Sequence, residues 1–109
     1  MKDHRLIDER SLAFDRLIAA KVRRDPRLLD KAREVLARWL EGEVGRGRAA
    51  WLEWQSLLDG PLPDILALLE SNGERAARLR QSSPFCGILT PAERLAIIRE
   101  FHARESLAA

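Results

Sequence analysis

The side chains that could catalyse a reaction or bind a metal are few and scattered along this 109-residue chain. Cys86 is the one cysteine, and it has no histidine near it in the sequence to act as the base that a cysteine nucleophile needs. His4 and His102 lie at opposite ends, and no cysteine–histidine group has the spacing of a zinc site. The sequence therefore predicts no enzyme, no metal and no cofactor, and it favours a buried, structural role for Cys86.

One segment, RQSSPFCGILTP from Arg80 to Pro91, combines turn residues with apolar side chains. Ser83 and Pro84 favour a turn, yet Phe85 and three further apolar residues follow them at once. Two interpretations remain open for the Phe85 ring: it plugs the protein's own core, or it docks into a partner. Burial in the core is favoured, because large apolar side chains are mostly buried.

Arginine dominates the basic residues, with 16 arginines against 3 lysines. Its planar guanidinium can bond two phosphate oxygens at once, and Arg75, Arg78 and Arg80 share one short predicted helix. However, the formal net charge is only +2, and no turn between helices has a helix-turn-helix signature. Nucleic-acid binding is therefore the alternative interpretation and not the favoured one.

The formal charges are segregated along the chain. Residues 16–48 carry a net charge of +5, residues 49–74 carry −5, and residues 75–109 carry +3. Such a distribution can steer a charged partner toward the protein, or the acidic and basic side chains can pair with one another inside the fold. We favour pairing or plain solvation, because charged helix faces are mostly exposed.

These side chains must be positioned by helices, because apolar residues recur every three or four positions and strand patterns are almost absent. Asp25 and Pro26 have the residue types of a helix start, as do Thr90 and Pro91 with Glu93 in the reciprocal capping position. The predicted architecture is a compact all-α domain over residues 1–109 with five or six short helices. In the last helix, we expect Leu95, Ile98 and Phe101 to face inward; the predicted helices span about 7–24, 26–41, 49–58, 63–70, 74–81 and 91 onward.

The apolar runs of the chain are short. None approaches the roughly 20 residues that a membrane helix needs, and the charged start MKDHRLIDER has no apolar stretch of a signal peptide. A lone cysteine cannot form an internal disulfide, which fits a reducing compartment. We therefore expect a cytoplasmic protein that does not contact a membrane.

Two segments, KVRRDPRLLDKAREVLARW and LRQSSPFCGILTPAERLAIIREF, resemble small, largely uncharacterised bacterial helical proteins of toxin–antitoxin-type gene pairs. Together they cover 42 of the 109 residues, about two-fifths of the chain. The resemblance implies a helical fold and a protein partner. It assigns no role to any residue, because no motif of known function comes with it.

Together, these observations favour a non-enzymatic protein-binding module. In its most specific form, it would be an antitoxin that neutralises a toxin, encoded nearby, by covering its active site. The alternative is a small DNA- or RNA-binding regulatory protein, and self-association is compatible with either. Interfaces are enriched in aromatic and arginine side chains. The predicted partner-binding residues are Arg78, Arg80, Gln81, Ser83, Pro84 and Phe85, together with Arg23 and Arg24 at the basic helix junction.

Overall fold

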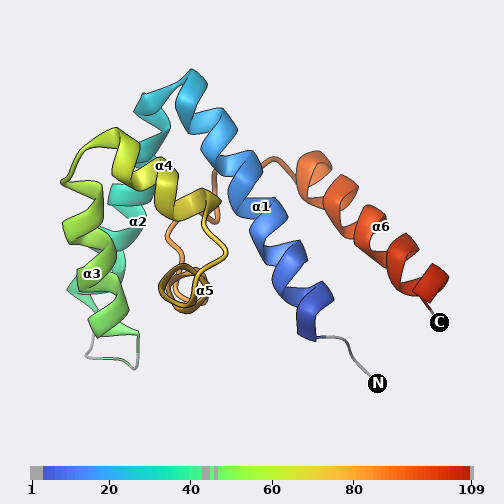
Figure 1. Ribbon diagram of the computed structural model, residues 1–109. Helices are drawn as coiled ribbons and strands as arrows, with labels where there is room; N and C mark the ends of the chain where they lie inside the picture. The colour runs from blue at the N-terminus through green and yellow to red at the C-terminus, as the bar shows by residue number, and fades with distance from the viewer. Residues whose placement is uncertain (1–3, 43–44, 46, 109) are drawn as a thin grey trace.

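The computed structural model describes residues 4–42, 45 and 47–108, and within these ranges the chain is helical without a strand (Figure 1). The all-α array of five or six helices is therefore confirmed. The helices of the described ranges are α1 (His4–Arg24), a short 3₁₀ helix η1 (Pro26–Leu28), α2 (Leu29–Glu41), α3 (Arg48–Leu58), α4 (Leu62–Glu70), α5 (Glu74–Arg80) and α6 (Pro91–Ala108).

Two helix starts have the local structure that their residue types predict. The Asp25 carboxylate accepts a hydrogen bond from the Arg27 backbone N–H at 3.3 Å, and Pro26 is the first residue of η1. Ahead of α6, the Thr90 hydroxyl accepts from the Glu93 N–H at 3.1 Å, while Glu93 accepts from the Thr90 N–H at 2.7 Å. This reciprocal capping satisfies two backbone donors that the helix itself leaves free.

Helix α1 is the central element of the array. It packs against α4 and α5 and also against α6, while α2 packs against α3. In Figure 1, α6 lies on the opposite side of α1 from α2 and α3. The connection from α5 to α6 therefore brings the chain back across α1.

The core lies between α1, α2, α3, α4 and α5. Trp54 is 1% exposed, and its indole N–H donates to the Leu79 carbonyl at 2.9 Å, so the polar edge of the ring is satisfied inside the core. Trp39 and Trp51 are half-buried and contact each other with ring centroids 5.5 Å apart. The core cluster consists of Ile18, Ala19, Val22, Leu29, Ala32, Leu36, Trp54, Leu58, Ile65, Leu66, Leu69, Leu79, Phe85, Ile88 and Leu89.

Helix α6 is only weakly buried. Phe101 is 6% exposed, as predicted, and Ile97 is half-buried. The prediction that Leu95 and Ile98 face inward is wrong, because they are 44% and 41% exposed. Helix α6 packs mainly on α1, so it buries one narrow face, and these two side chains lie at the edge of that face or beyond it.

No helix in the described part of the chain is both long enough and apolar enough to cross a membrane.

Candidate functional site

The segment between α5 and α6 is part of the core. Phe85 is 1% exposed, and its ring meets the Trp54 ring edge-on, with centroids 5.4 Å apart and planes 72° apart. Pro84, Ile88 and Leu89 are buried with it. The core interpretation of Phe85 is thus confirmed, and neither its ring nor Pro84 is available to a partner in this conformation.

Cys86 is exposed, so the prediction that it is buried is wrong. The Ile88 backbone N–H donates to the Phe85 carbonyl at 3.1 Å and closes a turn across Cys86 and Gly87. In such a turn, neighbouring side chains point in different directions. Phe85 fills the core, and the adjacent thiol is left on the surface.

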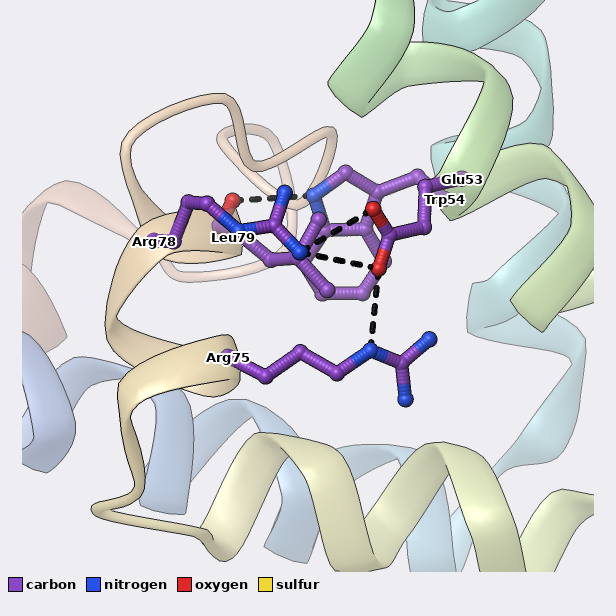
Figure 2. Close-up of polar contacts among 5 residues, drawn as sticks. All are labelled: Glu53, Trp54, Arg75, Arg78 and Leu79. Atoms are coloured by element: carbon purple, nitrogen blue, oxygen red, sulfur yellow. Dashed lines mark hydrogen bonds and ion pairs between the residues drawn. The ribbon is translucent and has the colours of Figure 1, made fainter.

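Arg78 lies in a junction between α3 and α5 (Figure 2). One nitrogen of its guanidinium is 3.1 Å from both Glu53 carboxylate oxygens, and Arg75 donates to the same carboxylate at 2.9 Å. The hydrogen bond from Arg75, reinforced by Arg78, holds the pKa of Glu53 below its usual range. The guanidinium of Arg78 therefore has an internal partner, although its side chain is 55% exposed.

The two arginines of the basic junction differ in their contacts. Arg23 on α1 forms an ion pair with Glu70 on α4. Arg24 is exposed and forms no ion pair within the described residues. The acidic residues Glu53 and Glu70 thus pair with the basic regions that flank them, which confirms internal pairing for part of the segregated charge.

The Arg80 side chain is largely covered, unlike that of Arg78. Its Nε donates to Asp15 Oδ2 at 3.0 Å, and a terminal nitrogen donates to the backbone carbonyl of Ser71. The two side chains of the ion pair are 9% and 7% exposed. The Arg80 side chain thus joins α5 to the middle of α1 through the ion pair, and to the connection between α4 and α5 through the hydrogen bond to Ser71.

Asp15 is the most deeply buried charged residue in the described part of the chain, and it was not among the predicted site residues. Burial raises its pKa from 3.8 to about 6, although the charge and the hydrogen bond of Arg80 act in the opposite direction. A signal was present, because Asp15 lies three residues from both Leu12 and Ile18 and so shares their buried helix face. Nothing local indicated Arg80 as its partner, since 65 residues separate the two.

A pocket of about 360 Å³ lies over this ion pair, between α1, α5, the segment 81–86 and the start of α6. We call it the Asp15 pocket. The Arg94 guanidinium lies 5.1 Å from the centre of the Phe14 ring at its rim. The lining residues are Ile7, Asp8, Ser11, Phe14, Asp15, Ile18, Ala77, Arg80, Gln81, Ser83, Phe85, Cys86 and Arg94.

The Asp15 pocket brings together half of the residues predicted to bind a partner. Arg80, Gln81, Ser83 and Phe85 line it. The other four do not: Arg78, Pro84, Arg23 and Arg24.

The Asp15 pocket combines apolar surface with polar and ionisable groups. Five of its thirteen lining residues are apolar, and the other eight carry polar or ionisable groups. One of these groups is a carboxylate whose pKa burial raises to about 6, and ionisable groups with shifted pKa values are more common at functional sites than on other surfaces. Within the described residues, no three histidine, cysteine or acidic side chains gather into a group that could hold a metal ion. The arrangement can therefore bind and orient a group that enters it.

No protein-family model matches the chain, and no curated protein or solved structure matches it either. These comparisons therefore assign no role to the Asp15 pocket or to any of its residues.

Proposed function

We propose that this chain is a non-enzymatic protein-binding module that contacts its partner at the Asp15 pocket. The observation that carries the proposal is the convergence of Arg80, Gln81, Ser83 and Phe85, from a segment whose composition suggests an interface, on one open pocket of about 360 Å³. Pockets of this size and polarity receive small ligands or single anchoring side chains.

The contact atoms differ from those that the sequence suggested. Phe85 forms the inner wall, and Arg80 is held by Asp15 and Ser71, so neither side chain is free to reach out. The partner meets the exposed rim, where Gln81 and Cys86 lie. In this proposal, the buried residues shape the pocket and the rim residues touch the partner.

In the form that the sequence resemblance suggests, the partner is a toxin encoded by the adjacent gene, and the complex forms in the cytoplasm. The test is copurification of this chain with that gene product, followed by size-exclusion chromatography. A tryptophan at the rim, Gln81→Trp, should obstruct the pocket and release the partner. Gln55→Trp is the matched control, because Gln55 is exposed on α3 and does not line the pocket.

Retention of a partner by the wild type and by Gln55→Trp, with its loss in Gln81→Trp, supports the proposal. Equal retention by both variants would place the contact elsewhere. A chain that runs as a monomer and retains nothing would overturn the protein-binding function itself.

The internal ion pairs favour protein over nucleic acid as the partner. The guanidinium groups of Arg23, Arg78 and Arg80 already pair with carboxylates of this chain, and a phosphate would have to displace those partners. A salt-sensitive mobility shift with duplex or single-stranded probes would contradict this preference.

A further inference from the structure

The Asp15 carboxylate, which lines the Asp15 pocket, has one oxygen without a hydrogen bond from the described residues. Arg80 occupies Oδ2, and no hydrogen bond reaches Oδ1 within the described residues. Every fully buried polar side-chain atom of the described residues does have a partner, so Oδ1 is not fully enclosed. Because Asp15 is 5% exposed and lines the pocket, Oδ1 is an acceptor that a group inside the pocket can reach.

The pocket surface is mixed: eight of its thirteen lining residues carry polar or ionisable groups, and the other five supply apolar walls, two of them aromatic. Phe14, Ile18 and Phe85 contribute to the apolar walls. The small side chain of Ala77 leaves the pocket wide on that side. The volume of about 360 Å³ has room for one large side chain rather than for a folded segment. The pocket therefore suits a side chain that combines an apolar ring with a hydrogen-bond donor at its tip.

The charges around the pocket argue for a neutral occupant. Asp8 and Asp15 supply two carboxylates, and Arg80 and Arg94 supply two guanidinium groups. A cationic side chain that approached Oδ1 would also approach the Arg80 guanidinium, which is bonded to the same carboxylate. A neutral donor gains the hydrogen bond without that repulsion.

We propose that the Asp15 pocket receives a tryptophan or tyrosine side chain of the protein partner, whose indole N–H or phenol O–H donates to Asp15 Oδ1. These two side chains combine an apolar ring with a polar tip that requires a partner when buried, and they are common anchors at protein interfaces. The inference rests on the proposed protein-binding function and specifies the anchor that the site recognises.

The occupant can be tested with small probes in place of the partner. Indole carries the donor, and indene has nearly the same shape without it. Binding of each to the full chain is followed by two-dimensional ¹⁵N NMR, with shifts expected at Ser11, Gln81 and Cys86. Because a hydrogen bond to a carboxylate is among the stronger ones, indole should bind about tenfold more tightly than indene.

Two variants locate the probe. Ala77→Leu narrows the pocket without touching the ion pair and should weaken indole binding about tenfold or more. Ala37→Leu is the matched control, because Ala37 is exposed on α2 and does not line the Asp15 pocket. Lowering the pH through about 6 should reduce the preference for indole over indene, because Asp15 then takes up a proton.

Equal affinity for indole and indene would overturn the donor–acceptor pairing with Asp15. Shifts outside the pocket, or no effect of Ala77→Leu, would overturn the pocket as the binding site. If the partner is retained and Gln81→Trp releases it while indole does not bind, the proposed function stands and this inference fails.

Discussion

The segment 84–89 and helix α6 follow each other in the chain, yet the loop is the better buried of the two. Four of its six residues, Pro84, Phe85, Ile88 and Leu89, are buried. Helix α6 has 18 residues, and Phe101 is the one buried side chain among those of Pro91 to Leu107. Regular secondary structure therefore does not identify the part of the chain that holds this fold together.

The physical reason lies in the neighbours that each region meets. The 84–89 segment enters a space that several helices enclose, so each apolar side chain there loses nearly all of its water contact. Helix α6 packs mainly on α1, so most of its surface stays in water. We therefore expect the 84–89 segment to unfold only with the whole domain. Helix α6 should detach separately, at a lower free-energy cost.

The largest effect should come from the loop. Phe85→Ala removes a fully buried ring that packs edge-on against Trp54 and leaves a cavity. We expect a loss of about 4 kcal/mol in the free energy of unfolding, measured by chemical denaturation. A loss below about 1 kcal/mol would mean that Phe85 is not packed as described.

Arg80→Met should be the next most damaging change. It leaves the buried Asp15 carboxylate without its counterion, which should cost about 3 kcal/mol near pH 8. Near pH 5 the loss should be smaller, because Asp15 can take up a proton. Arg78→Met is the control, since that ion pair is exposed and should be worth about 1 kcal/mol or less. Equal losses in the two variants would show that the Asp15–Arg80 pair is not buried.

The raised pKa of Asp15 also predicts a pH dependence of stability in the wild type. The folded protein holds this proton more tightly than the unfolded chain, so the contribution of Asp15 is most favourable below about pH 4 and is lost as the pH rises through about 6. The change is at most about 3 kcal/mol. Asp15→Asn cannot ionise, so the difference in stability between it and the wild type should vary over this range. A constant difference would contradict the shift.

Phe101→Ala tests whether helix α6 is attached to the rest of the fold only weakly. We expect α6 to detach from α1 while the remaining helices stay folded, so that the global free energy of unfolding changes by about 1 kcal/mol. Hydrogen exchange would then show fast amides in α6 and unchanged protection at Leu79 and Ile88. Loss of protection throughout the chain would mean that α6 is an integral part of the core.

The smallest effects are expected at the exposed apolar residues of α6. Leu95→Ser and Ile98→Ser should each change stability by less than about 0.5 kcal/mol, because both side chains are already more than two-fifths exposed. Thermal denaturation of the two variants checks this. A larger loss would show that another surface covers these side chains in solution.

Local signals in the sequence account for the helices and their starts. Asp25 with Pro26, and Thr90 with Glu93, act within a few residues, so their residue types were enough to predict them. The inward side of α6 depends on which helices surround it, and the sequence does not specify that. The prediction for Leu95 and Ile98 was wrong for this reason.

The candidate site was predicted only in part. The composition of the segment after Arg78 suggested an interface, and four of the residues predicted to bind a partner, all from this segment, line the pocket. The pocket itself depends on Asp15, which meets Arg80 across 65 residues. Contacts over such a separation leave no local pattern in the sequence. The ion pair and the carboxylate oxygen without a hydrogen bond are therefore visible only in the folded chain.

The buried carboxylate of Asp15 is the group that the pocket, its hydrogen-bond acceptor and the predicted pH dependence of stability all involve. Its pKa can be measured directly by following the Asp15 carboxyl carbon in a ¹³C NMR titration of the wild-type protein. The structure predicts a midpoint of about 6. A midpoint near the ordinary value of 3.8 would mean that burial does not outweigh the Arg80 ion pair, and it would contradict the raised pKa on which the predicted pH dependence rests.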